Sequence, residues 1–332
     1  MTDKPIEKHK SDSWVTYRPE IKVIDCTVRD GGLMNDHRFD DAFVKTVYDT
    51  CIAAGIQYME LGYKASKKIF SPTASGPWKF CDENDIRRIV GDKPAPSLKL
   101  CAMADAERTD YHTDILPKEK SVLSCIRVAT YIHQIPTAID MIKDAHDKGY
   151  ETTLNLMSIS VVKEHDLDEA LEVLVKTPVD AIYLVDSFGA LYSEQIRDLA
   201  VKFLAAVKGT GKEVGIHAHN NQQLAFANTI EAIICGANRL DATIAGLGRG
   251  AGNCPLELLL GFLRNPAFDQ RPVLETIQKT FIPLSKKLDW GYSIPYMITG
   301  QLNVHPRDAI KMRTSANPDD YVTFYDQMIN EA

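Results

Sequence analysis

The chain has 332 residues, of which 45% are hydrophobic and 25% are charged, and its formal net charge is −7. This composition is typical of a folded globular protein, and an acidic chain without a long basic cluster is not expected to bind nucleic acid. No stretch approaches the ~18 apolar residues that cross a membrane, and the seven scattered cysteines form no Cys-x-x-Cys pair, so we expect a cytoplasmic protein with reduced thiols and no membrane partner. Residues 1–20 are polar and charged and are predicted to form a flexible N-terminal arm.

Eight short runs rich in β-branched or aliphatic residues follow this arm and are predicted strands: 21–26, 56–61, 97–103, 122–129, 151–157, 180–186, 213–219 and 239–244. Segments with helical periodicity lie between most of them, at 40–54, 135–148, 166–177, 193–207 and 222–236. A repeat of roughly 30 residues is what βα units require. Eight such units in residues 21–265 predict an α/β fold, a (β/α)₈ TIM barrel. The structural alternative is a doubly wound parallel sheet.

Residues 255–263 are predicted to form the last barrel helix, and residues 266–332 a C-terminal helical extension. Prolines punctuate this extension, and helical segments are expected around 284–288, 306–312 and 320–329. The extension could cap the barrel, reach a partner subunit, or do both. We expect the protein to form a homo-oligomer, in the simplest case a dimer.

Polar residues stand where several of the predicted strands end, which is where the catalytic groups of a TIM barrel lie. These residues are Arg29, Asp30, Glu60, Asn155, Asp186, Ser187, His217 and His219. Arg29 and Asp30 are expected to lie on a tight turn with Gly31 and Gly32, although such turns are often solvated surface. Glu60 is equally compatible with a structural ion pair, and the same holds for Asp186.

His217 and His219 are two residues apart on a predicted strand, so both side chains point to the same face. A lone histidine is more often a core residue, but two imidazoles in one pocket favour a metal ion. Asp30 would complete a set of two histidines and one carboxylate. Such a set suits Mn²⁺, Mg²⁺, Fe²⁺, Co²⁺ or Zn²⁺.

The segment 246–252 has glycine at every second position and Arg249 inside it. Its spacing differs from that of a dinucleotide-binding fingerprint. We expect its backbone N–H groups to cradle an anion, or the segment to deliver Asn253 as a further oxygen ligand. The simplest alternative is a tight loop that leads into the helix beginning at Pro255.

Three motifs together resemble those of the DRE-TIM metallolyases, a family that includes 3-hydroxy-3-methylglutaryl-CoA lyase, isopropylmalate synthase and 4-hydroxy-2-oxovalerate aldolase. The motifs are Asp25-x-Thr27-x-Arg29-Asp30-Gly31, Asp186-Ser187-x-Gly189 and His217-x-His219-Asn220, with Glu60 at the end of the second strand. Residues 186–190 are most similar to the aldolase branch. The resemblance implies that Asp30, His217 and His219 bind a divalent metal ion, Mn²⁺ or Mg²⁺ first and Zn²⁺ or Co²⁺ otherwise. Asn253 would be a fourth ligand, as in some members.

The resemblance also implies a carbon–carbon lyase, which cleaves or forms a bond in a 4-hydroxy-2-oxo acid through a pyruvate-type enolate. Arg29 would stabilise the enolate oxygen. The substrate-binding residues would be Arg29, Glu60, Asn155, Asp186 and Ser187. The expected partners are a small 2-oxo acid and an aldehyde, and a dehydrogenase is a candidate protein partner.

Two positions depart from the family pattern. Leu33 stands where the aldolases carry a histidine proposed as general base, and Gly32 stands where the synthases carry a glutamate. We therefore predict His37 and Tyr292 as the proton-transfer residues, since each follows a segment that faces the barrel mouth. The alternatives are an acyl-CoA-dependent Claisen synthase similar to isopropylmalate or homocitrate synthase, a non-catalytic barrel scaffold, and an Fe²⁺ oxygenase with a facial triad.

Overall fold

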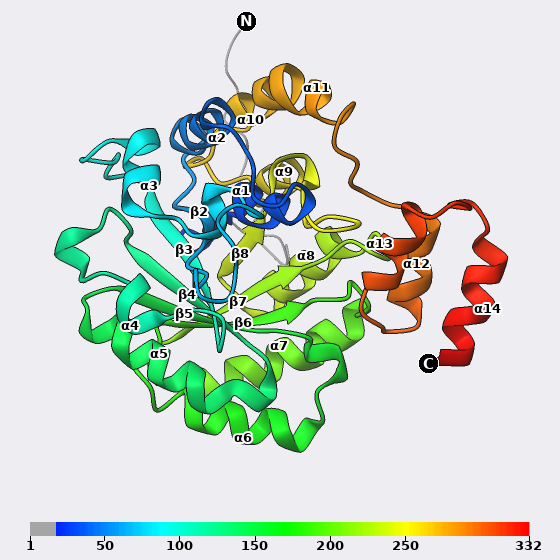
Figure 1. The fold of residues 1–332 in the computed structure, drawn as a ribbon. Helices are drawn as coiled ribbons and strands as arrows, with labels where there is room; N and C mark the ends of the chain where they lie inside the picture. The colour runs from blue at the N-terminus through cyan, green and yellow to red at the C-terminus, as the bar shows by residue number, and fades with distance from the viewer. Residues whose placement is uncertain (1–17, 332) are drawn as a thin grey trace, which may run out of the picture.

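The computed structural model describes residues 18–331, so almost all of the predicted arm lies outside the described residues. Eight parallel strands pair in sequence order, and β8 pairs with β1 to close the barrel (Figure 1). The strands are β1 Lys22–Asp25, β2 Tyr58–Tyr63, β3 Lys99–Asp105, β4 Cys125–Thr130, β5 Glu151–Leu156, β6 Ala181–Asp186, β7 Glu213–Ala218 and β8 Arg239–Ala242. The (β/α)₈ prediction is confirmed, and the doubly wound alternative is wrong.

Helices surround the strands on the outside of the barrel (Figure 1). They are α2 Asp41–Ala53, α3 Glu83–Val90, α4 Tyr111–Asp114, α5 Ile135–Asp147, α6 Glu164–Leu174, α7 Ser193–Val207, α8 Ala225–Cys235 and α9 Leu256–Leu263. Each longer helix buries one apolar face against the strands, as the spacing of Ala138, Met141, Ile142 and Ala145 in α5 illustrates. Besides this core between helices and strands, a separate apolar cluster includes Tyr58 and Tyr183.

The extension after the barrel is helical, as predicted, but its helices differ in part from the expected ones. They are α10 Arg271–Thr276, the π-helical turn Ile277–Phe281, α11 Ile282–Leu284, α12 Ile294–Gln301, α13 Arg307–Arg313 and α14 Tyr321–Glu331. The helix expected around 284–288 is wrong, because α11 ends at Leu284. The sequence prediction missed α12, which carries Pro295 in its first turn, where proline is compatible with a helix.

Helix α12 packs against the loops that follow β7 and β8, and this contact holds the extension at the barrel mouth. The Asn221 side chain donates a hydrogen bond to the Tyr296 carbonyl over 3.5 Å. Tyr296 is 1% exposed and belongs to an apolar cluster that joins Ala251 of the β8 loop to α13 and α14. The extension therefore caps one side of the barrel, which was one of the two roles considered for it.

The opposite end of the barrel, where the strands begin, carries a ring of ion pairs that we call the basal ring. Arg239 lies 2.5 Å from Glu213 and 2.7 Å from Glu151. Lys22 and Lys99 pair with the same two carboxylates, at 2.8 and 2.7 Å. The basal ring links β1, β3, β5, β7 and β8, so it stabilises closure of the barrel far from its mouth.

All seven cysteines are free, and six of them are buried. Among residues 18–331, no helix is both long and apolar enough to cross a bilayer.

Candidate active site

The end of β1 does not form the predicted tight turn. The chain continues directly into α1, Thr27–Gly31, and Gly31 has a helical backbone with φ −60° and ψ −30°. Glycine is needed here for space: a Cβ on Gly31 would lie 2.8 Å from the Leu247 side chain, and one on Gly32 would lie 2.5 Å from His37 Nδ1. The close packing of α1 places Arg29 and Asp30 at the barrel mouth.

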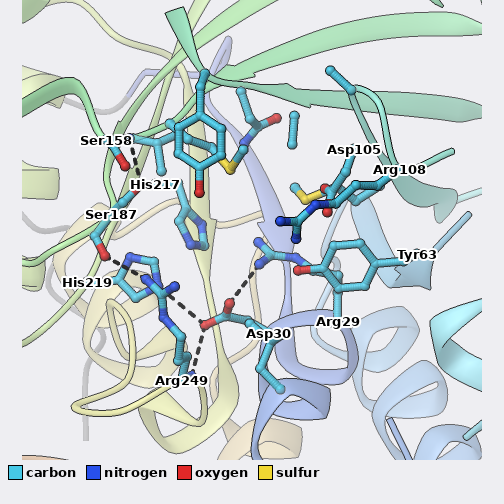
Figure 2. Close-up of a pocket in the computed structure, with 18 of the residues that line it drawn as sticks. Arg29, Asp30, Tyr63, Asp105, Arg108, Ser158, Ser187, His217, His219 and Arg249 are labelled. Carbon is cyan, nitrogen blue, oxygen red and sulfur yellow. Dashed lines mark hydrogen bonds and ion pairs between the residues drawn. The ribbon is translucent and has the colours of Figure 1, made fainter. Parts of the chain in front are cut away.

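Asp30, His217 and His219 meet at this mouth (Figure 2), although Asp30 lies about 190 positions before the two histidines in the sequence. One ligand atom from each lies within 4.8 Å of the others, and all three residues are buried. His219 Nε2 is 3.8 Å from Asp30 Oδ2. The Nε2 atoms of both histidines are buried and have no hydrogen-bond partner among the described residues. A buried polar atom without a partner is costly, and a divalent cation would satisfy both nitrogens, so these residues fit a metal site.

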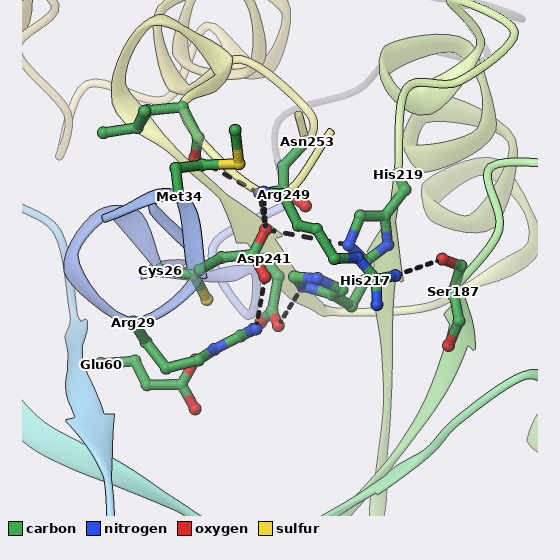
Figure 3. A network of polar contacts seen from close by, with 12 residues as sticks. Cys26, Arg29, Met34, Glu60, Ser187, His217, His219, Asp241, Arg249 and Asn253 are labelled. Atoms are coloured by element: carbon green, nitrogen blue, oxygen red, sulfur yellow. Dashed lines mark hydrogen bonds and ion pairs between the residues drawn. The ribbon is translucent and has the colours of Figure 1, made fainter. Parts of the chain in front are cut away.

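The other ring nitrogens hold the two histidines in place (Figure 3). His217 Nδ1 lies 2.9 Å from Asp241 Oδ2, and His219 Nδ1 lies 3.1 Å from the Asp186 carbonyl oxygen. Outer contacts of this kind orient the histidine ligands of metal sites and leave Nε2 free for the ion.

Asn253, which the sequence suggested as a further ligand, lies beside Asp30. Its Nδ2 donates a hydrogen bond to the Asp30 carboxylate, and its buried Oδ1 has no partner among the described residues. The loop comes so close that a Cβ on Gly248 would lie 2.1 Å from Asn253 Nδ2 and 2.3 Å from Asp30 Oδ2. The Arg249 backbone N–H donates to the same Asp30 oxygen over 3.3 Å. The glycine-rich loop thus delivers Asn253 and also contacts an anionic group with its backbone.

Arg29 is held by two carboxylates and keeps one nitrogen free. Its Nε donates to Glu60 and its Nη1 to Asp30, each over 2.7 Å. Its Nη2 is buried without a partner among the described residues. Burial would raise the pKa of Asp30, but the Arg29 charge and the two imidazoles hold that pKa below its usual value. Asp30 is therefore ionised at neutral pH.

A second buried arginine, Arg127, extends this network into the barrel. Arg127 lies 3.1 Å from Glu60 and 2.6 Å from Asp241. Glu60 thus bridges two arginines, and Asp241 joins Arg127 to His217. The alternation of charges satisfies groups that would be costly to bury alone.

Two of the predicted substrate-binding residues do not line the cavity at the mouth. Glu60 is fully buried between Arg29 and Arg127. The Asp186 carboxylate accepts hydrogen bonds from the backbone N–H groups of Ala190 and Leu191, over 3.0 and 3.2 Å, and burial raises its pKa to about 7. Glu60 thus has the structural ion pair that the sequence left open as an alternative, whereas Asp186 accepts backbone hydrogen bonds and forms no ion pair among residues 18–331.

Asn155 and Ser187 do line the cavity, together with Arg29 and with Asp30, His217 and His219, which we call the candidate metal-binding cluster. The Oδ1 atom of Asn155 is buried without a partner among residues 18–331. The Ser187 hydroxyl accepts a hydrogen bond from the Ser158 backbone N–H over 2.8 Å.

The structure brings neither predicted proton-transfer residue to the cavity surface. His37 is buried behind Gly32, with its ring edge-on to Tyr63 at 5.3 Å between centroids. Burial, with the charges of Lys79 and Arg29, lowers the pKa of His37 to about 3, which makes it a weak base. Tyr292 is 47% exposed and does not line the cavity, because it lies in the linker before α12.

The cavity has a volume of about 230 Å³, and much of its wall was missed by sequence reasoning. The missed polar residues are Tyr63, Lys79, Asp105, Arg108, Tyr131, Gln134, Ser158 and Arg307. The sequence could have indicated two of them, because Tyr63 and Asp105 follow predicted strands. They are the last residues of β2 and β3, each two positions beyond the predicted strand end. Five of the remaining six lie in loops or short turns and Arg307 begins α13, so strand periodicity gives no indication of their direction.

A closed parallel barrel with a buried two-histidine, one-carboxylate cluster at its mouth defines the class of metal-site TIM barrels. Residues 20–280 match the HMGL-like family model. The chain therefore belongs to the HMGL-like family, within the DRE-TIM superfamily that its motifs indicate.

Two curated relatives and one solved structure illustrate the similarity. The chain is 31% identical to oxaloacetate decarboxylase of Mycobacterium tuberculosis over 253 residues, which is 75% of this chain and 71% of that protein. It is 29% identical to 4-hydroxy-2-oxovalerate aldolase 2 of Mycolicibacterium smegmatis over 248 residues, 73% of this chain and 68% of that one. The N-terminal domain of a candidate aldolase from Bacteroides vulgatus has a TM-score of 0.75 and 27% identity, and the match covers 91% of this chain and 100% of that one.

Proposed function

We propose that this protein is a divalent-metal-dependent lyase that cleaves or forms a carbon–carbon bond in a 2-oxo acid through a pyruvate-type enolate. The observation that carries the proposal is the juxtaposition of two free histidine Nε2 atoms, the Asp30 carboxylate and the free Arg29 Nη2 in one cavity. The relatives named as an aldolase and a decarboxylase act on 2-oxo acids, as their names state, which supports the same chemistry here.

Asp30, His217 and His219 would hold the ion, with Asn253 as a further oxygen donor, and Mn²⁺ or Mg²⁺ is our preferred candidate. A bound divalent ion supplies Lewis-acid polarisation of a carbonyl oxygen. Arg29 Nη2 would donate to the substrate oxygen that gains negative charge as the bond breaks. Because Glu60 and Asp30 already fix the guanidinium, little reorganisation is needed at that moment. Asn155 and Ser187 would contact the substrate from the opposite wall.

The leading substrate class is a 4-hydroxy-2-oxo acid, which a retro-aldol step divides into pyruvate and an aldehyde. That step needs a base to accept the proton of the 4-hydroxyl group. His37 and Tyr292 stay our sequence-based candidates, but neither lines the cavity. The His37 ring only contacts Tyr63 edge-on, and its Nδ1 is buried without a hydrogen-bond partner among the described residues, so no proton path from His37 to the cavity is present.

One observation favours a second candidate, decarboxylation of a 2-oxo acid with a carboxylate on C3, such as oxaloacetate. Leu33 is part of the cavity wall at the position where the aldolases carry their base. Loss of CO₂ leaves no proton to be accepted from a hydroxyl group, so an apolar residue is compatible with that step. The relative named oxaloacetate decarboxylase supports the same alternative.

The test uses the full chain loaded with Mn²⁺ or Mg²⁺. We expect pyruvate from oxaloacetate or from 4-hydroxy-2-oxovalerate, and exchange of the pyruvate methyl protons with deuterated solvent. Arg29→Lys should slow both reactions strongly, since lysine cannot bind two carboxylates and still present a planar donor. Absence of pyruvate from both substrates, together with absence of exchange, would contradict the proposal.

The other interpretations predict different products. A Claisen synthase would release free thiol from acetyl-CoA in the presence of a 2-oxo acid, and an Fe²⁺ oxygenase would consume O₂ with 2-oxoglutarate. A scaffold would show none of these activities. Homodimer formation and a dehydrogenase partner stay predictions, to be checked by sedimentation and by copurification with a dehydrogenase.

A further inference from the structure

The C-terminal extension contributes side chains to the cavity. His305 and Arg307 line the same cavity as Arg29 and Asp30, yet both lie beyond residue 280, where the match to the family model ends. They occupy the connection between α12 and the start of α13. This connection is therefore a part of the cavity wall that belongs to the extension and not to the barrel.

The α12–α13 connection is fixed against the barrel. Asn303 Nδ2 donates to the Ser160 carbonyl in the β5 loop over 3.1 Å. The His305 ring packs edge-on against Phe188 of the β6 loop, with 5.7 Å between centroids. The Arg307 backbone N–H donates to His305 Nδ1 over 3.1 Å. His305 thus has a defined orientation, and its Nδ1 acts as an acceptor.

Two of the three charged side chains that act on His305 are arginines, and the third is Asp308. Burial and the charges of Arg249 and Arg307 lower the pKa of His305 to about 4, so at neutral pH the ring is uncharged and carries its proton on Nε2. That N–H is a donor. Arg249 is anchored by its Nη2, which donates to the Ser187 carbonyl over 2.6 Å.

The facing wall adds Lys79 and Arg108, and Figure 2 shows Arg108 pointing toward the side of the cavity that holds Arg29 and Tyr63. Among the ion pairs of residues 18–331, none includes Lys79, Arg108, Arg249 or Arg307. The acidic residues in the wall are Asp30, in the candidate metal-binding cluster, and Asp105, which faces Lys79 and Arg108. Outside the candidate metal-binding cluster, the wall thus has more cations than anions.

We propose that Arg307 and the His305 Nε2–H group, together with Arg249, bind a second carboxylate at the end of the substrate remote from the 2-oxo group. The preferred substrates would then be dicarboxylic 2-oxo acids. The inference rests on the proposed function for the position of the 2-oxo group at the candidate metal-binding cluster. It assigns selectivity to two residues of the extension, and it favours dicarboxylates over the monocarboxylic 4-hydroxy-2-oxovalerate.

The experiment compares binding of 2-oxoglutarate and 2-oxopentanoate to the Mn²⁺-loaded full chain by calorimetry. The two acids have the same carbon chain and differ in the remote carboxylate. The intact protein should bind 2-oxoglutarate at least about ten-fold more tightly than 2-oxopentanoate. This ratio of dissociation constants corresponds to the net free energy of about one charge-assisted hydrogen bond. Arg307→Ala should reduce this preference by about five-fold or more, and Arg307→Lys, which keeps the charge, should retain part of it.

Lys311→Ala is the matched control. Lys311 lies one turn further along α13, pairs with Asp308 and does not line the cavity. Like Arg307→Ala, Lys311→Ala removes one positive charge from α13, but it should leave the preference for 2-oxoglutarate unchanged. His305→Gln, which keeps a side-chain N–H donor, should retain more of the preference than His305→Ala. Circular dichroism of each variant reports whether the fold is retained.

The outcomes separate this inference from the proposed function. Equal binding of the two acids by the intact protein, or an unchanged preference in Arg307→Ala and Arg307→Lys alike, would overturn the inference. A dicarboxylate preference without pyruvate formation or proton exchange would overturn the proposed lyase activity and leave the remote site standing.

Discussion

Arg29 and Asp30 connect the parts of the site through a few buried hydrogen bonds. Both carboxylates that hold Arg29 are buried, so they fix the guanidinium in a low-dielectric environment where hydrogen bonds to a developing negative charge are strongest. Asp30 also accepts hydrogen bonds from the Arg249 backbone and from Asn253. One residue thus couples the arginine, the glycine-rich loop and the two histidines of the candidate metal site.

Replacing Asp30 tests this coupling directly. Asp30→Asn keeps the shape but removes the charge that would bind the ion, so we expect loss of stoichiometric Mn²⁺ in metal analysis. We also expect a decrease in kcat/KM of about 10³-fold or more, since Lewis-acid stabilisation is worth several kcal/mol.

Asp36→Asn is a suitable control for this variant, because Asp36 is exposed and only six positions further along. It should bind the metal and turn over substrate like the unaltered chain. Retention of metal and activity by Asp30→Asn would show that the ion, if any, binds elsewhere.

His37 makes a prediction about pH. Its pKa is about 3 in the folded chain and about 6.5 when unfolded, so between these values protons bind preferentially to the unfolded state. The stability that neutral His37 contributes is complete above about pH 6.5 and is lost as the pH falls toward 3. Asparagine tolerates the positive φ of 60° at this position.

We therefore expect His37→Asn to lose less stability than the unaltered chain between about pH 7 and pH 4.5, by roughly 2 kcal/mol. Urea unfolding at the two pH values measures the difference. Parallel losses in both proteins would contradict the pKa assignment. The kcat of the same variant at neutral pH tests the predicted catalytic role of His37.

At the scale of elements, the glycine-rich loop is the most sensitive part of the site. Gly248→Ala would place a methyl group 2.3 Å from Asp30 Oδ2 and 2.1 Å from Asn253 Nδ2. Either the loop or Asp30 must then move. We expect metal affinity to fall by about 10- to 100-fold, as for other changes that displace the support of a ligand.

Gly261→Ala provides the matched control for this loop variant. Gly261 lies inside α9, and its new Cβ would contact Gln270 Nε2 at an ordinary 3.4 Å. Removing a helical glycine should stabilise the chain by about 0.5–1 kcal/mol and leave metal binding unchanged. Calorimetric metal titration of both variants decides whether the space at Gly248 matters.

The sequence predicted the barrel elements well because each strand and each long helix has its own periodic pattern. It failed where tertiary contacts decide the local structure. The region after β1 became a helix because α1 packs beneath Leu247, and β2 and β3 extend to Tyr63 and Asp105 because neighbouring strands pair with them.

The same reasoning explains which parts of the site were predictable. His217 and His219 share a strand face, so their spacing alone brings them together. The direction of His305 depends on the docking of α12, for which the local sequence has no pattern. Arg307, at the start of α13, was not predicted at all.

At the scale of the whole molecule, the two ends of the barrel have different roles. The basal ring at the start of the strands contributes to stability, whereas the mouth holds the candidate metal-binding cluster and the cavity. This division is common to TIM barrels, and here it can be tested with Glu151, which pairs with Lys99 and Arg239 and accepts a hydrogen bond from Tyr58.

Glu151→Gln should lower the free energy of unfolding by roughly 2 kcal/mol, since it weakens one of the two ion pairs of the buried Arg239 and removes the ion pair of the half-exposed Lys99. Its kcat/KM should stay within about two-fold of the unaltered value. Glu172→Gln, which breaks an exposed pair with Lys176, should cost less than about 1 kcal/mol. A large loss of activity in Glu151→Gln at a temperature where it is folded would argue against the division.

The position of the α12–α13 connection in the chain has a consequence for biosynthesis. A chain leaves the ribosome from its N-terminus, so β8 can pair with β1 before α12 and α13 have been translated. At that stage the candidate metal-binding cluster and Arg29 are assembled, but the mouth is open on the side of His305. The wall closes only when Tyr296 packs against Ala251. During synthesis, the residues proposed for catalysis would therefore come together before the part of the cavity wall that we propose selects among substrates.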